Sequence, residues 1–175
     1  MKKNILVPSV TVLICALVLA LLSFGLSGVA KANAEAELTA KMQAILPGSS
    51  VFTEETYTGD DANIRRVFAA ENGYVIETAT NGYAGEIVML IGVDKDGKVT
   101  GLQVRNMEET FGLGGEALTD HEFLRQYLQT SGEAEVGVNV DAITGATVTS
   151  KAVTRCVNSA VAYVTGADAS SGATS

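Results

Sequence analysis

The stretch Asp141-Ala-Ile-Thr-Gly-Ala-Thr147-Val-Thr-Ser150 joins two segments that have different hydrophobic periods. Before it, Val136, Val138 and Val140 alternate with Gly137 and Asn139, which is the period of a half-buried strand. After it, apolar residues recur at steps of three and four, which places them on one face of an amphipathic helix. These helical residues are Val148, Ala152, Val153, Cys156, Val157, Ala160, Val161 and Val164. The sequence therefore predicts a strand, a glycine turn and a helix.

A helix that begins at this turn would favour an anion at its N-terminus. The first N–H groups of a helix have no partner within it, and the helix dipole is positive at that end. Gly145 lets the backbone approach a ligand closely, because it has no Cβ. The Thr147 hydroxyl is then well placed to meet a phosphate. The alternative is that Thr147 simply caps the helix.

The same stretch resembles the Asp-x-x-Ser/Thr-Gly-Ala-Thr flavinylation signature of a known family. That family comprises the FMN-binding domains in the G-subunit of the Rnf complex and in the C-subunit of the sodium-pumping quinone reductase. The matching residues here are Asp141, Thr144, Gly145, Ala146 and Thr147. The resemblance implies that a flavin transferase joins FMN to Thr147 through a phosphoester bond, while Asp141 and Thr144 shape the turn that receives the phosphate.

Two further blocks carry the resemblance. One is similar to the family's Glu-Thr-Pro-Gly-Leu-Gly loop, which lies beside the flavin, and it reads Glu109-Thr110-Phe111-Gly112-Leu113-Gly114. It departs from the family at Phe111, where proline is usual, and its glycines would otherwise be simple turn residues. The other block covers Gly82-Tyr-Ala-Gly-Glu86 and residues 87–104. Together, the similar blocks span most of residues 74–164.

A second copy of the signature lies near the end of the chain, at Asp168-Ala-Ser-Ser-Gly-Ala-Thr174. It sits in low-complexity sequence and lacks both a preceding strand and a following helix. Thr174 is therefore a possible second flavinylation site, secondary to Thr147.

Residues 1–30 are predicted to form a membrane anchor. No charged residue lies between Lys3 and Lys31, and the apolar run is long enough to cross a hydrocarbon core of about 30 Å as a helix. Lys2 and Lys3 favour a cytoplasmic N-terminus, which places the remaining domain outside the cytoplasm. The alternative is a signal peptide cleaved after Ala32-Asn-Ala34. In either case the domain is exported.

Charge and composition exclude several classes of function. Without Lys2 and Lys3, ten basic residues face 20 acidic ones, and the resulting charge of about −10 disfavours nucleic-acid binding. Cys15 and Cys156 fall in the anchor and in the last helix, so no disulfide is expected. His121 is the only histidine and has no acidic partners at metal-ligand spacing, so no metal site is predicted.

The remaining pattern predicts an α+β fold with an antiparallel sheet and flanking helices. A helix is expected from Ala34 to Ile45, ended by Pro47-Gly48, and another from about Asp120 to Gln129, capped by Thr119 or Asp120. Strands are expected at residues 64–69, 74–80, 85–93 and 98–104. The FMN-binding domain would thus cover residues 31–165, followed by a disordered tail over 166–175.

The resemblance implies a membrane-anchored, extracytoplasmic electron-transfer subunit of an Rnf-type ion-translocating oxidoreductase. Its partners would be the membrane and electron-transfer subunits of that complex, and the chain alone would not turn over a metabolite. The nearest rival within the family is the C-subunit of the sodium-pumping quinone reductase, but family members of that kind are longer than this chain. Two alternatives remain open: a stand-alone exported FMN-binding electron carrier, and an anchored interaction domain without a cofactor.

Overall fold

The computed structural model describes residues 14–18, 21, 32–107, 115, 118, 120–132 and 134–167. The chain divides into two compact units, residues 1–40 and 41–175. In the first unit, the described residues are helical and mostly exposed. Within the described ranges, no helix combines the length and the apolar composition needed to cross a membrane. Most of the predicted anchor, residues 1–13, 19–20 and 22–30, lies outside those ranges.

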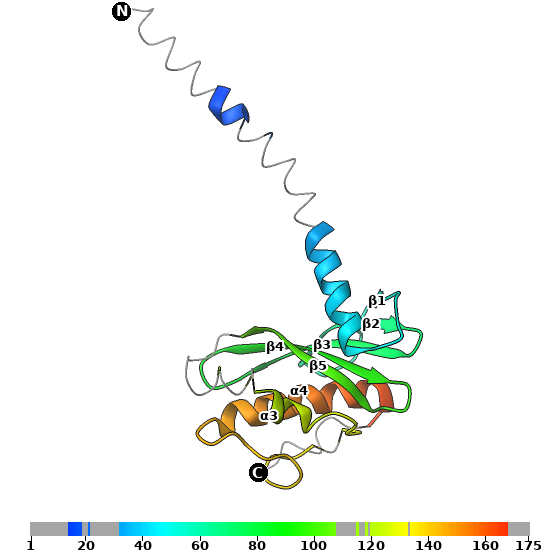
Figure 1. Ribbon diagram of the computed structural model, residues 1–175, viewed down its shortest axis with the longest axis vertical. Helices are drawn as coiled ribbons and strands as arrows, with labels where there is room; N and C mark the ends of the chain where they lie inside the picture. Colours follow the sequence, from blue (N-terminus) through cyan, green and yellow to red (C-terminus); the bar gives the residue numbers. More distant parts are fainter. Residues whose placement is uncertain are drawn as a thin grey trace, which may run out of the picture. The chain divides into compact units, whose positions relative to one another are not determined.

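The second unit is built on an antiparallel sheet of five strands in sequence order, β1-β2-β3-β4-β5 (Figure 1). The strands are β1 Thr53–Glu55, β2 Ile64–Ala70, β3 Gly73–Asn81, β4 Glu86–Asp94 and β5 Val99–Met107. The four predicted strands and their antiparallel pairing are confirmed. Strand β1 was not predicted, because its Thr-Glu-Glu sequence is wholly exposed and has no apolar alternation.

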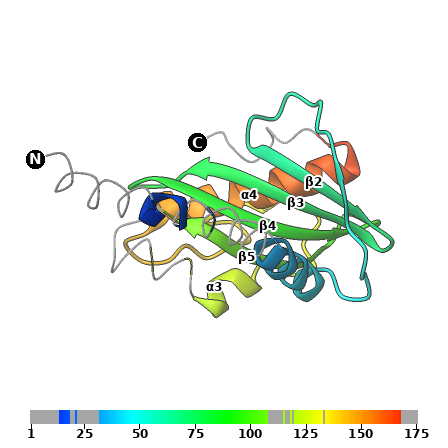
Figure 2. The same cartoon turned by 90° about the horizontal axis from the view of Figure 1, so that it is seen from above.

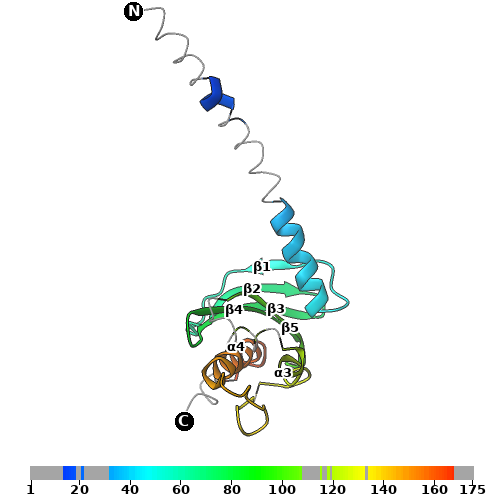
Figure 3. The same cartoon turned by 60° about the vertical axis from the view of Figure 1, so that its left-hand side comes forward.

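Helix α4, Thr147–Thr165, covers one face of this sheet (Figures 1 and 3). Its buried side chains pack with those of alternate strand residues such as Ile76, Met89 and Ile91, which are fully buried. The predicted apolar face is confirmed from Ala152 to Val161. Val148 departs from it, because 49% of its surface is exposed in the first turn of the helix.

The opposite face of the sheet is covered in part by the end of the first helix. Residues 32–45 are helical, as predicted, and Met42, Ile45 and Leu46 are buried. Thr100 Oγ1 donates to the Ile45 carbonyl at 2.6 Å. A Cβ on Gly101 would lie 2.7 Å from Ile45 Cα, so only glycine permits this approach. The sheet is thus covered on both sides where Gly92 of β4 and Gly101 of β5 meet Ile45.

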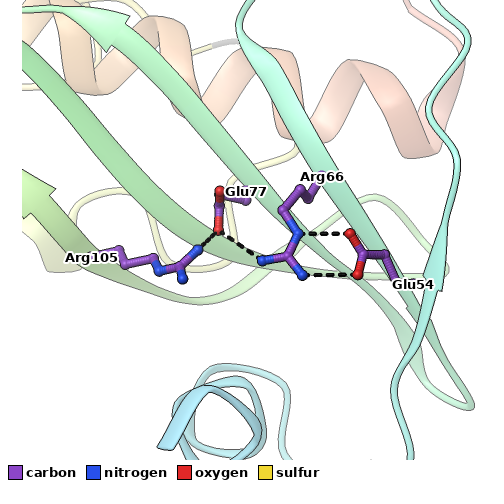
Figure 4. A network of polar contacts seen from close by, with 4 residues as sticks. All are labelled: Glu54, Arg66, Glu77 and Arg105. Atoms are coloured by element: carbon purple, nitrogen blue, oxygen red, sulfur yellow. Dashed lines mark hydrogen bonds and ion pairs between the residues drawn. The ribbon is translucent and has the colours of Figure 1, made fainter. Parts of the chain in front are cut away.

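Four charged side chains cross this second face from β1 to β5 (Figure 4). Glu54 accepts two hydrogen bonds from Arg66, at 2.7 and 2.8 Å, and these hold the pKa of the Glu54 carboxyl below its usual value. Glu77, whose side chain is only 9% exposed, lies between Arg66 and Arg105 and pairs with both. The network therefore connects strands β1, β2, β3 and β5, and it fixes the position of Arg105 on the edge strand.

The second predicted helix is shorter than expected. Helix α3 covers His121–Arg125, and its N-cap is Asp120, whose side chain accepts from the N–H groups of Glu122 and Phe123. Residues 126–129, predicted to be helical, form turns instead. The cause is tertiary: Gln129 takes a positive φ of 66° and donates its N–H to the Val99 carbonyl at the start of β5.

The predicted strand over Val136, Val138 and Val140 was wrong. Residues 137–139 form a turn closed by a bridge between Val136 and Val140. Gly137 has a φ of 86°, which an extended strand does not allow, and the Glu135 carbonyl accepts from the N–H groups of residues 138–140. Val140 is buried but Val138 is 74% exposed. The alternating valines therefore belong to a tight turn in which Val140 is buried and Val138 is exposed.

Cys156 lies at the centre of the α4 packing surface and provides a test of it. The thiol is fully buried, and burial raises its pKa to about 11. We expect iodoacetamide at pH 8 to alkylate Cys156 far more slowly in the folded protein than in urea, as measured by mass spectrometry of the peptide from Cys156. Because the folded pKa is the higher one, this thiol should also lower stability as the pH rises from about 9 towards 11. Rapid native alkylation would contradict this packing.

Candidate functional site: the turn at the start of helix α4

The segment from Asp141 to Thr147 forms a tight turn that leads directly into α4. Gly145 has a φ of 81°, a left-handed conformation that favours glycine, and the Ala146 N–H closes the turn on the Ile143 carbonyl at 2.9 Å. Ser150 fastens the turn from within the helix. Its hydroxyl accepts from the Ile143 N–H at 3.2 Å and donates to the Ala146 carbonyl at 3.0 Å.

A side chain that follows α3 holds the start of this segment. The Gln126 carboxamide accepts from the Asp141 N–H at 2.7 Å and donates to the Asp141 carbonyl at 3.3 Å. Next to it, Tyr127 is fully buried and its hydroxyl lies 2.8 Å from Thr154 Oγ1 on α4. The segment is therefore held at Asp141 by Gln126, and at Ile143 and Ala146 by Ser150.

The helix start is left open towards solvent. The first backbone bond of α4 runs from the Ser150 N–H to the Ala146 carbonyl, so the N–H groups of residues 147–149 have no partner within the helix. The N-cap, Ala146, has no side chain that could cap them, and the first turn contains no acidic residue. Thr147 itself is exposed.

These features suit a phosphate group. Free N–H groups at a helix start are donors to an anion, and the absence of a competing carboxylate leaves that positive end available. In the same turn, Thr149 Oγ1 is buried and has no hydrogen-bond partner in the described part of the chain. That hydroxyl lies inside the fold, so a phosphate esterified to Thr147 would meet the backbone N–H groups of the first turn instead.

The structure brings together only part of the predicted site. Thr144, Gly145 and Thr147 are exposed on one turn, Ala146 is buried beneath it, and Asp141 is exposed at the start. The loop residues Glu109, Thr110, Gly112, Leu113 and Gly114 lie outside the described residues, as does Thr174.

Sequence reasoning missed two residues that shape the turn. Ser150 ends the stretch that begins at Asp141, and its spacing of four from Ala146 was the available signal for a side chain that bonds back to a carbonyl. Gln126 gave no signal, because it is 15 residues from Asp141 and only the packing of α3 brings the two together.

Gly145 offers a direct test of the turn. We expect Gly145→Ala to destabilise the folded domain by about 1 kcal/mol, because a left-handed conformation is unfavourable for a residue with a Cβ. The measurement is equilibrium unfolding in urea. Gly166, which has a φ of 70° at the other end of α4 with open space around it, provides a matched control. If Gly145→Ala has no effect while Gly166→Ala destabilises, the turn does not need this conformation.

Comparison with known proteins identifies the class of this domain. Residues 82–162, which include the α4 turn, match the model of the FMN-binding domain. The G-subunit of an ion-translocating oxidoreductase complex from Methanosarcina acetivorans is 37% identical over 139 residues, which is 70% of this chain and 72% of the relative. The chain belongs to this family of FMN-binding subunits.

Two further relatives are G-subunits of complexes with named activities. The one from the Na⁺-translocating ferredoxin:NAD⁺ oxidoreductase complex of Acetobacterium woodii is 39% identical over 51% of this chain. The one from the proton-translocating ferredoxin:NAD⁺ oxidoreductase complex of Clostridium ljungdahlii is 39% identical over 56% of it. The chain spans 47% and 59% of the lengths of these two relatives. The crystal structure of Shewanella oneidensis NqrC matches with a TM-score of 0.46 at 25% identity, over 61% of this chain and 62% of that one.

Proposed function

We propose that this chain is the electron-carrying G-subunit of an ion-translocating oxidoreductase complex, and that it holds FMN through a phosphoester bond to Thr147. The observation that carries this is the combination of an exposed Thr147 hydroxyl with an uncapped helix start, inside the segment that matches the FMN-binding domain. Asp141, Thr144 and Gly145 form the turn that presents the hydroxyl, and Gln126 and Ser150 hold that turn in place.

The protein's part in this function is attachment and orientation. FMN supplies the redox chemistry of its ring when bound. The N–H groups of residues 147–149 would donate to the phosphate oxygens, and the Gly145 turn would leave them accessible. Because α4 is packed on the sheet from Thr149 to Val161, a group esterified to Thr147 would be held at the start of a rigid element. A covalent tether also replaces a low bulk concentration of free cofactor with a high local one.

We further propose that residues 1–30 anchor the chain in the membrane, with the domain of residues 31–165 outside the cytoplasm. The support is the uncharged run between Lys3 and Lys31 and the placement of its relatives in ion-translocating complexes. The partners would be the other subunits of such a complex, together with a flavin transferase that acts on Thr147.

The experiment is to produce the chain with a flavin transferase in an exporting host and to analyse tryptic peptides by mass. Thr147 falls in the peptide Gln126–Lys151 and Thr174 in the peptide Cys156–Ser175. We expect the FMN mass on the first peptide and flavin fluorescence on the denatured chain. A chain that carries no flavin under these conditions would support a cofactor-free interaction domain instead.

Two further measurements separate the remaining alternatives. Protease added to spheroplasts should digest the domain while the N-terminus stays protected, and a mature protein beginning at Glu35 would refute the anchor. Co-purification with integral membrane subunits would support a complex, whereas a flavinylated chain that purifies alone from its native membrane would support a stand-alone carrier.

A further inference from the structure

Strand β5, which has nine residues, forms one edge of the sheet. Its nine residues contain a single charged side chain, Arg105, and no proline. At its start, the Val99 N–H and carbonyl pair with Thr130 and Gln129. Beyond Val99, β4 is the only strand that pairs with β5 in the described part of the chain. Edge strands usually carry charges, proline or a cover, because their free N–H and carbonyl groups otherwise pair with another chain.

A cavity of about 720 Å³ runs beside this edge, between β5 and α3. Figures 2 and 3 both show α3 next to β5, on the side away from β4. All eight residues from Thr100 to Met107 line it. Successive side chains of a strand point to opposite faces, so a cavity on one face would be lined by every second residue only. The cavity therefore follows the open edge of β5, and we refer to it as the β5 groove.

The charge of the β5 groove is opposite to that of the chain. The protein carries a net charge of −8, yet the described residues that line the groove include Arg105, His121 and Arg125 and no aspartate or glutamate. Glu77 holds Arg105 in position and offsets part of its charge, whereas Arg125 is exposed at the last turn of α3. Apolar side chains such as Leu102, Val104 and Leu124 line the rest.

We propose that the β5 groove binds an extended acidic segment of a partner polypeptide, which pairs with β5 as an added strand. The open edge would supply backbone hydrogen bonds, the apolar lining would take alternate side chains, and the arginines would favour carboxylates on the others. The volume alone would also suit a small molecule, but lining by eight consecutive strand residues favours a chain. This inference goes beyond the proposed function and does not depend on flavin attachment.

The test uses the full-length chain in detergent and a fluorescein-labelled peptide of alternating glutamate and valine. Two matched probes accompany it: a peptide of alternating lysine and valine, and the acidic peptide with every backbone nitrogen methylated. We expect fluorescence anisotropy to show binding of the acidic peptide, with affinities at least about tenfold weaker for both other probes. Hydrogen–deuterium exchange of residues 101–107 should slow when the acidic peptide is bound.

Two variants locate the site on the protein. Arg125→Glu reverses a charge that lines the groove, and we expect it to weaken binding of the acidic peptide about tenfold. Lys95→Glu makes the same change of charge at an exposed turn outside the groove lining, and it should alter affinity by less than about twofold.

Several results would overturn the proposal. They are the absence of binding by the acidic peptide, equal binding of the lysine or methylated peptide, unchanged exchange in β5, and equal effects of the two variants. Displacement of the peptide by free FMN would assign the groove to the flavin instead. Measured on chain without flavin at Thr147, the other results do not depend on flavin attachment, so this proposal and the proposed function can fail separately.

Discussion

Replacing Thr147 by alanine is expected to remove essentially all covalently bound flavin. The substitution deletes the hydroxyl that would form the ester, while Thr147 is an exposed first residue of α4 whose loss should change stability by no more than about 0.5 kcal/mol. The measurement is flavin fluorescence of the denatured chain, together with the mass of the peptide Gln126–Lys151, after production with a flavin transferase. A urea unfolding curve on the same sample shows that the fold is intact.

Two control variants sharpen this result. Thr147→Ser keeps a hydroxyl at the same helix start, so it should retain part of the flavin that Thr147→Ala loses. Thr174→Ala removes the hydroxyl of the second signature and should leave most flavin in place. Flavin that persists in Thr147→Ala but disappears in Thr174→Ala would move the attachment site to the tail. An unmodified wild-type chain in a competent host would rule out covalent attachment altogether.

Replacing Tyr127 by alanine is expected to destabilise the domain by about 3–5 kcal/mol, the usual cost of removing a buried aromatic side chain. Tyr127 is fully buried, packs edge-on against Phe123 with ring centroids 5.5 Å apart, and meets Thr154 Oγ1 at 2.8 Å. Because typical domains are stable by only about 5–15 kcal/mol, this loss should be evident in urea unfolding followed by circular dichroism.

The variant Tyr127→Phe separates the packing of the ring from its hydrogen bond. It keeps the ring and removes only the hydroxyl, so it should cost about 1–2 kcal/mol. Equal losses for the two variants would show that the hydroxyl, and not the buried ring, connects the segment after α3 to α4. Since Gln126 and Tyr127 are adjacent, a loosened Tyr127 should also weaken the hold on Asp141 and lower flavin attachment.

Strands β2 to β5 and the buried face of α4 were predictable because each follows from a local repeat. A strand turns successive side chains to opposite faces and a helix returns to one face every 3.6 residues, so burial leaves a period in the sequence. The helix from Ala152 to Val161 and the hairpin at Gly97, which has a φ of 81°, follow these rules. Strand β1 lacks such a period, and only its pairing with β2 makes it a strand.

The segment before the α4 turn shows where local reasoning failed. The spacing of Val136, Val138 and Val140 fits a strand as well as it fits a turn with alternate residues on one side. Two features make this segment a turn and not a strand. Gly137 has a positive φ, and the Glu135 carbonyl accepts from the N–H groups that would otherwise donate to a neighbouring strand. No partner strand reaches this segment in the described part of the chain, so the turn is the conformation that satisfies its backbone.

The sequence by itself determined the position of the glycine turn before α4, because a glycine, a small hydroxyl residue and a helix start are adjacent in the chain. The tertiary structure alone decided what holds that turn and what surrounds it. Gln126 reaches Asp141 across 15 residues, and Glu77 meets Arg105 across 28. Such pairs leave no period in the sequence, since their partners are brought together only when α3, α4 and the sheet pack around one core.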